Sequence, residues 1–417
     1  MTDGSRAIPS LVQLEQALDY LLAQAKHTER VEIIPLMQAS GRVLAENQHA
    51  LVSAPLADNS AVDGYAVNSR DLKKDKEKCL PVQQRIVAGR IGTALQSGTA
   101  ARIFTGAFLP EGADAVVMQE QCRVVEGGVV LLAGVQKGQN VRFRGEDFNS
   151  NDVLLKQGSV LRPQHVGLLA AMGISHVPVV KPLRIAVFST GNELVEPGHD
   201  LQAGQIYNSN RYLLAGLIKE LGCEFVDGGN IVDDLATTKK MLQQAAMSAD
   251  LVITSGGVSV GEEDYVKNAL EAIGRLKLWH LAIKPGKPLA YGEIDHLPGK
   301  TPFFGLPGNP AAVLVTFLIL VRPYVLKMMG VALNPPVTIR GLAQFDQKKS
   351  SIRREYLRAR WVPGPEGQAL IYKHDNQSSG MLSSATWANG LAVIDANQTV
   401  SLGEPIEFLP FSSLYGA

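Results

Sequence analysis

RIAVFSTGNEL (residues 184–194) opens the stretch of sequence that decides the fold. DLVITSGGVSV (250–260) and FFGLPGNPAAVLV (303–315) repeat its order of a short apolar run followed by a glycine-containing polar loop. Amphipathic patterns such as LATTKKMLQQAAM (235–247) separate these runs. Alternating strand and helix signals are typical of a doubly wound α/β domain with a mainly parallel sheet. We therefore expect such a domain over residues 183–330.

The segments on either side of this domain have different patterns of apolar residues, glycines and prolines. Residues 51–147 consist of short β-branched runs punctuated by glycine, and they predict an inserted small β module. Residues 1–50 and 148–182 flank this module and are expected to pack together as one discontinuous N-terminal linker domain of mixed helix and strand. After a proline-rich break, residues 335–417 contain short strands and turns, which predict a small β-barrel-like C-terminal domain.

Two helices are expected in the linker domain. Leucines recur at three- and four-residue steps over residues 10–26, which predicts an amphipathic helix with Ser10 as its N-cap. A short second helix is expected at 164–172, opened by Pro163.

The composition argues against several classes of function. Forty Lys plus Arg balance forty Asp plus Glu, so no overall field favours nucleic acid or an anionic membrane. The three cysteines are too widely spaced for a thiol metal site and fit a reducing compartment. Because the first residues also lack the pattern of a secretory signal, we expect a cytoplasmic protein. The histidine spacings give no zinc motif.

The longest uncharged window, residues 301–321, has the length of a membrane span. Pro307, Gly308 and Pro310 interrupt it and leave only residues 311–321 continuous. We therefore expect a buried helix there and no membrane association.

Three loops directly follow expected strands of the α/β domain, and ligands bind at the carboxyl ends of strands in such sheets. Glycines in the loop at 254–261 allow backbone N–H groups to approach an anion, and its serines add hydroxyl donors. A tight turn would explain the same glycines, and a helix start with an early proline would explain the loop at 306–310. The anion-binding candidates are Ser255, Gly256, Gly257, Ser259, Pro307, Gly308, Asn309 and Pro310.

Two lysines add positive charge. Lys284 and Lys287 are three residues apart in KPGKP (284–288), where the prolines restrict the backbone. Both ammonium groups can thus be directed at one anion with little ordering cost. A solvated loop is the alternative interpretation.

Acidic residues beside the loops are candidates for binding Mg²⁺, which is held in proteins by one or two carboxylates together with phosphate oxygens. Glu193 and Asp264 are the first candidates, and Asp233 is a third. An N-cap ahead of Leu235 is the more ordinary role for either Asp233 or Asp234.

Outside the α/β domain, polar groups crowd the segment 58–66, which includes Asp63. Thr105 and Asp147 lie in other segments of the β module that are also explained as plain turns. In the C-terminal domain, strand alternation would place Arg354, Arg358 and Arg360 on one face, which is expected to be solvated.

Six segments combine in a fixed order and spacing: DNSAVDGYAV (58–67), RIFTGAFLPEGADAVVMQE (102–120), STGNEL (189–194), TSGGVSVGEEDY (254–265), IKPGKP (283–288) and GLPGNP (305–310). Taken together, they resemble the molybdopterin molybdenumtransferase family of molybdenum cofactor biosynthesis, whose eukaryotic relative is the E domain of gephyrin. Asn208 is a departure, since many relatives have Asp there.

The resemblance implies Mg²⁺-dependent insertion of molybdate, the co-substrate, into adenylylated molybdopterin, with release of AMP. It also implies an elongated homodimer, in which the linker domain dimerises and the β module faces the partner's α/β domain. Other enzymes of the pathway are plausible partners. Carried over by motif, the catalytic positions are Asp63, Thr105, Asp147, Glu193 and Asp264, and the metal positions are Glu193, Asp233 and Asp264. Lys284 and Lys287 join the loop residues as substrate positions. Arg354 and Ser379 are added as substrate positions on the pterin side by analogy alone.

Two other functions remain open at this point. The α/β domain alone also resembles molybdopterin adenylyltransferases, which attach AMP rather than release it. A non-catalytic scaffold of the gephyrin kind, binding a partner peptide at the C-terminal domain, is the second alternative.

Overall fold

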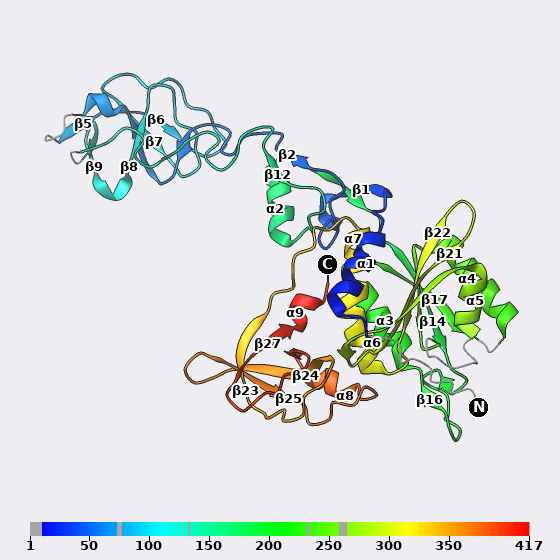
Figure 1. The fold of residues 1–417 in the computed structure, drawn as a ribbon. Coiled ribbons are helices and arrows are strands. Elements are labelled where there is room, and N and C mark those ends of the chain that lie inside the picture. The colour runs from blue at the N-terminus through cyan, green and yellow to red at the C-terminus, as the bar shows by residue number, and fades with distance from the viewer. Residues whose placement is uncertain (1–10, 73–76, 132–133, 232–233, 258–264, 417) are drawn as a thin grey trace, which may run out of the picture.

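The computed structural model describes residues 11–72, 77–131, 134–231, 234–257 and 265–416. Figure 1 shows an elongated chain with the β module (blue to cyan) at one end and the α/β domain (green to yellow) at the other. The C-terminal domain (orange to red) lies beside the α/β domain.

A six-stranded sheet forms the centre of the α/β domain. Its order is β17 (Glu224–Ile231), β14 (Arg184–Thr190), β18 (Leu251–Ser255), β22 (Lys300–Leu306), β21 (Pro288–Asp295) and β19 (Gly274–His280). The pairings β14–β17, β14–β18 and β18–β22 are parallel, and the two that join β22, β21 and β19 are antiparallel. This confirms the predicted mainly parallel α/β architecture.

Helices cover both faces of the sheet. Ile185 and Val187 of β14 face the layer that contains α3 (Ser209–Glu220), whereas the alternate residues Ala186 and Phe188 face the opposite layer. That opposite layer is built by α4 (Leu235–Ser248) and α5 (Tyr265–Ile273). Because both faces of the sheet are buried, the sequences of its parallel strands are continuous apolar runs.

The longest apolar helix lies in the layer with α3. It runs through α6 (Pro310–Thr316), a π-helical turn (Phe317–Val321) and α7 (Arg322–Met328). By length and mean hydropathy (1.8) it would pass for a membrane span, but 78% of its most apolar window is buried inside the protein. Such burial is typical of a core helix, as the sequence predicted.

Helix α1 (Leu14–Gln24) packs on the same layer but begins later than the sequence predicted. Gln13 occupies the N-cap position without a side-chain bond, so the predicted helix start with Ser10 as the N-cap is wrong; Ser10 itself lies outside the described residues. Val12 instead forms a parallel bridge with Leu281, and its amide donates to the carbonyl of His280. This extended pairing keeps the chain out of the helix until Leu14.

Paired strands on either side of the β module form the linker region. β1 (Val31–Pro35) pairs with β13 (His176–Val180), and β2 (Gln48–His49) pairs with β12 (Val153–Leu155). Helix α2 (Pro163–Ala171) begins with proline at its first turn, as predicted. Because the chain leaves and returns through neighbouring strands, the β module is an insertion.

Two small sheets make up most of the β module. The four-stranded sheet has the order β6 (Val82–Ile86), β7 (Ala100–Ile103), β4 (Gly64–Val67), β8 (Ala115–Met118). The three-stranded sheet has the order β5 (Lys78–Leu80), β10 (Gly128–Leu131), β9 (Cys122–Val125).

The C-terminal domain is a closed barrel. Its strands are β23 (Ile339–Ala343), β24 (Arg354–Pro363), β25 (Ala369–Lys373), β26 (Gly390–Ile394) and β27 (Pro405–Pro410), and the extra pairing of β24 with β26 closes the ring. A two-residue strand of the α/β domain, β20 (Ile283–Lys284), adds to β24 in parallel. Two domains are thus joined through a backbone ladder beside the KPGKP segment.

Candidate anion site between the α/β domain and the C-terminal barrel

The predicted loops do meet at the carboxyl edge of the parallel strands. The amide of Gly256 donates to the carbonyl of Leu306 over 3.0 Å, and a Cβ on Gly308 would lie 3.9 Å from Gly256 Cα. Asn210 of α3 donates through Nδ2 to the Gly308 carbonyl over 2.7 Å. Glycine-rich loops from two adjacent strands therefore form one surface.

The first of these loops requires its glycines. Gly256 and Gly257 have φ of +90° and +67°, a region that L side chains rarely adopt. A Cβ on Gly256 would also lie only 2.6 Å from Thr190 Oγ1. Beside them, the Ser255 hydroxyl is buried and has no hydrogen-bond partner among the described residues. An unpaired buried hydroxyl at a glycine loop is available to a ligand.

The second loop is held by the C-terminal domain. Asn309 is the N-cap residue of α6, but its side chain donates through Nδ2 to Ser379 Oγ over 3.0 Å. The backbone carbonyl of Ser379 accepts from the amide of Ala311 over 2.9 Å. Ser379 is a predicted substrate position that is distant from this loop in sequence. In the structure it lies directly at the loop that contains Pro307 and Pro310.

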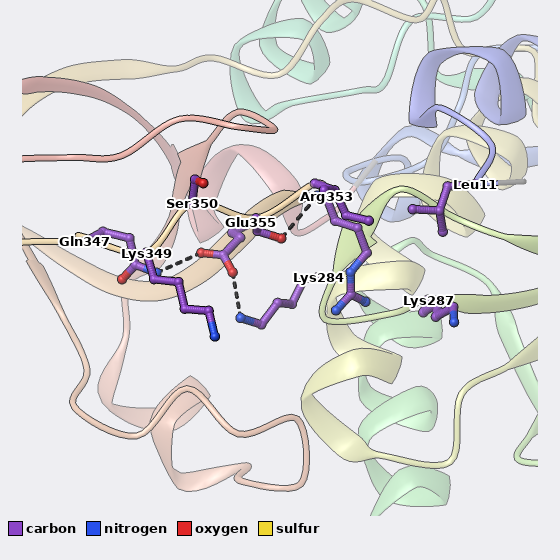
Figure 2. A pocket seen from close by; sticks show the side chains of 10 residues that line it. Leu11, Lys284, Lys287, Gln347, Lys349, Ser350, Arg353 and Glu355 are labelled. Atoms are coloured by element: carbon purple, nitrogen blue, oxygen red, sulfur yellow. Dashed lines mark hydrogen bonds and ion pairs between the residues drawn. The ribbon is translucent and has the colours of Figure 1, made fainter.

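A cavity of about 460 Å³ opens between the second loop, the KPGKP segment and the C-terminal domain. Its lining includes the cations of Lys284, Lys287 and Arg353 together with Ser378 and Ser379. An adjoining cavity of about 510 Å³ shares the three cations and adds Lys349, while Glu355 is the acidic residue in its lining (Figure 2). Concentrated positive charge with hydroxyl donors is what a multiply charged oxyanion requires.

The arginines of β24 do not share one solvated face as predicted. Arg358 is 1% exposed, and burial lowers the pKa of its guanidinium to about 10. It donates to Ser384 Oγ over 3.0 Å and to the Ser378 carbonyl over 2.9 Å. Closure of the barrel brings the segment that contains Ser378 over the face of β24 on which Arg358 lies. Arg358 therefore holds this segment through its two hydrogen bonds.

Arg354 lies outside both cavity linings. Its guanidinium pairs with Glu15 of α1 over 2.5 Å and with Asp395 over 2.8 Å. The neighbouring residue Arg353, which was not predicted as a site residue, lines both cavities instead.

Asp63 and Thr105 lie together in the β module. Thr105 donates to Asp63 Oδ1 from its amide over 2.8 Å and from its hydroxyl over 2.7 Å. Asp147 is exposed, and its amide donates to the carbonyl of Ala54 near the start of the module. None of the three lines the cavities around Lys284 in this chain.

The metal candidates are only partly described. Asp233 and Asp264, like the anion candidate Ser259, lie outside the described residues. The Glu193 side chain is exposed and lies over Gly191, where a Cβ would approach Glu193 Oε2 to 2.5 Å. In the described ranges no group of three His, Cys, Asp or Glu side chains is arranged to hold a metal. Glu193 is the one metal candidate among the described residues, and its carboxylate is an oxygen donor of the kind that Mg²⁺ uses together with phosphate.

Two nearby polar residues have structural roles. Asp234 is the N-cap of α4 and accepts from the amide of Thr237 over 2.7 Å, which confirms the capping role considered for Asp233 or Asp234. Asn208 is the N-cap of α3, and its Nδ2 donates to Ser189 Oγ over 2.9 Å and to Glu196. An aspartate at position 208 would lack these donor bonds.

Family models match almost the whole chain. The MoeA N-terminal region (domain I and II) matches residues 12–173, the probable molybdopterin binding domain matches 186–327, and the MoeA C-terminal region (domain IV) matches 340–411.

Individual relatives agree with these matches. A molybdopterin molybdenumtransferase from Haemophilus influenzae is 39% identical and covers 97% of this chain and 100% of its own length. A Nostoc molybdopterin molybdenumtransferase is 36% identical over 96% of this chain and 93% of its own. The solved molybdopterin biosynthesis moeA protein from Pyrococcus horikoshii OT3 superposes with a TM-score of 0.83 at 30% identity, covering 96% and 100% of the two chains. The chain belongs to the molybdopterin molybdenumtransferase (MoeA) family.

Proposed function

We propose that this protein transfers molybdenum from molybdate to adenylylated molybdopterin and releases AMP. The observation that carries the proposal is the cavity where Lys284, Lys287 and Arg353 meet Ser379 and the loop at 307–309, because its cations and hydroxyl groups can bind both an oxyanion and a diphosphate. Two relatives matched over 100% and 93% of their own lengths carry the name molybdopterin molybdenumtransferase.

In this proposal the lysines and Arg353 bind molybdate, and the Ser255–Gly257 loop and the start of α6 bind the phosphates. Mg²⁺ is the proposed cofactor, and Glu193, Asp233 and Asp264 would hold it. When bound, such an ion neutralises phosphate charge. A cytoplasmic location is proposed as well, since the three cysteines are unpaired.

We further propose a homodimer in which Asp63, Thr105 and Asp147 of one copy complete the site of the other. The supporting observation is their position in a module at the far end of the elongated chain from the α/β domain (Figure 1). A site that combines these three residues with Lys287 then needs two chains.

The test is AMP release and molybdenum retention when the purified protein receives adenylylated molybdopterin, Mg²⁺ and low molybdate. Wild type should release AMP in a molybdate-dependent manner, and Asp63→Asn and Lys287→Gln should each lose most of this activity. Formation of adenylylated molybdopterin from molybdopterin and ATP in a parallel assay would instead indicate an adenylyltransferase, and binding without turnover would indicate a scaffold.

Mixed dimers test whether the site is shared. When Asp63→Asn and Lys287→Gln chains are unfolded together and refolded, one site of each mixed dimer has an intact module and an intact cavity. We expect activity to return in the mixture. If each site lay within one chain, the mixture would stay as inactive as its components.

A further inference from the structure

Glu355 is a buried carboxylate in a cavity lined by cations. It lies in β24 directly opposite Lys284 of β20 in the parallel ladder, and it is only 2% exposed. In the 510 Å³ cavity it is accompanied by Lys284, Lys287, Lys349 and Arg353. A carboxylate in such a place repels the anion that the cations attract, so its position calls for a role.

Both oxygens of the carboxylate are held. Lys284 Nζ lies 2.6 Å from Oε1, and Gln347 Nε2 donates to Oε2 over 3.1 Å (Figure 2). Gln347 is fixed in turn, since its Oε1 accepts from Lys373 Nζ over 3.0 Å. The carboxylate therefore has one orientation, set by Lys284 at one oxygen and by Gln347 of the C-terminal domain at the other.

The lysine end of the pair faces the cavity. The Lys284 side chain is 48% exposed whereas the Glu355 side chain is 3% exposed. An ammonium group has three N–H donors, and Glu355 occupies one of them. No second partner of Lys284 Nζ is found in the described part of the chain, so the other two donors are available to a ligand in the cavity. A buried ion pair adds little net stability compared with a well-packed neutral pair, so stability alone does not account for this arrangement.

We propose that Glu355 is a positioning residue that fixes Lys284 for the bound oxyanion and lowers the positive charge of the empty cavity. The inference rests on the proposed function. With an oxyanion bound, Lys284 bridges the carboxylate behind it and the anion in front of it. The carboxylate thereby fixes the anion's place relative to the glycine loops and weakens the capture of other anions.

Two substitutions separate charge from position. Glu355→Gln keeps the size and an accepting oxygen but removes the charge, so molybdate and phosphate should both bind several-fold more tightly, and discrimination between them should fall. Glu355→Asp keeps the charge but withdraws the carboxylate by one methylene, so affinity should not rise. In both variants we expect kcat to fall by about tenfold or more, because Lys284 is misplaced. Glu407→Gln, an exposed carboxylate of the same barrel, is the matched control.

Equilibrium dialysis with molybdate or phosphate alone, together with steady-state kinetics and a thermal melt, measures these effects. A fall in kcat with unchanged or lower KM for molybdate in Glu355→Gln supports the proposal. Unchanged affinity and kcat in both variants overturn it, as does a loss of activity explained entirely by unfolding in both. Since dialysis needs no turnover, absent wild-type AMP release alongside altered anion binding in Glu355→Gln would reject the proposed function while keeping this role.

Discussion

Thr105 donates both its backbone amide and its hydroxyl to a single oxygen of the Asp63 carboxylate, over 2.8 and 2.7 Å. The amide bond contributes most, the hydroxyl bond follows, and together with the charge of Arg102 they hold the pKa of Asp63 below its ordinary value. Two residues that are 42 positions apart in sequence thus form one unit that keeps a carboxylate ionised.

Replacing Thr105 by valine tests this unit. The variant keeps the amide bond and loses the hydroxyl bond, so the Asp63 pKa should rise part of the way towards its ordinary value. A lowered pKa gives a stabilisation that is present above the unfolded-state pKa and is lost as pH falls through the folded-state pKa. Thr105→Val should therefore be less stable than wild type at neutral pH, with the difference disappearing in acid. Carboxyl NMR titration measures the shift, and Thr105→Ser should preserve the wild-type value. An Asp63 pKa unchanged by valine would contradict the role given to the hydroxyl.

Ser255 offers a test of the glycine loop. Its buried hydroxyl lacks a partner in the described part of the chain, so Ser255→Ala removes an unsatisfied group and should leave the melting temperature unchanged or higher. Binding of adenylylated molybdopterin should weaken, with KM rising about tenfold, because a hydrogen bond to a charged ligand contributes roughly 1.5–3 kcal/mol.

Ser248→Ala is the matched control for Ser255→Ala. Within the described residues its hydroxyl bonds to carbonyls in the last turn of α4, at the other edge of the sheet, so KM should not change. Strong destabilisation by Ser255→Ala would mean that the hydroxyl is bonded within the protein.

Much of the α/β domain could be predicted because its signals are local. Glycines at positive φ, the Pro310 helix start and buried strands each leave a pattern within a few residues. Strand order then brings Ser255 and Pro307 to one edge without further information. The loops of the candidate site were predictable for this reason.

Residues of the C-terminal barrel were harder to predict because their positions depend on register between domains. The pairing of Lys284 with Glu355 follows from β20 joining β24, and a two-residue strand leaves no sequence pattern. Strand alternation distinguished Arg353 from Arg354 but gave no sign of which one faces the cavity. The burial of Arg358 likewise follows from barrel closure, which alternation alone does not reveal.

Arg358 provides a test of how the barrel supports the site. Arg358→Met removes the bonds to Ser384 and to the Ser378 carbonyl while keeping a long side chain. Amides of residues 377–384 should exchange hydrogen faster, and turnover should fall by about tenfold, because Ser379 is less well placed. Arg340→Met, an exposed arginine of β23, should change neither quantity. Unaltered exchange in 377–384 would show that Arg358 does not hold this loop.

Lys287 is the most direct test of the cavity's charge. Unlike Lys284, it has no ion-pair partner in the ranges that the structure describes, so Lys287→Gln should leave the melting temperature unchanged. Molybdate binding measured by dialysis at low salt should weaken about three- to tenfold, a modest loss because the ammonium is solvent-exposed. The difference from wild type should shrink as salt screens the charge. Lys219→Gln at the exposed end of α3 removes the same charge elsewhere and should bind molybdate as wild type does. Equal molybdate affinity in Lys287→Gln and wild type at low salt would place the oxyanion away from the KPGKP segment.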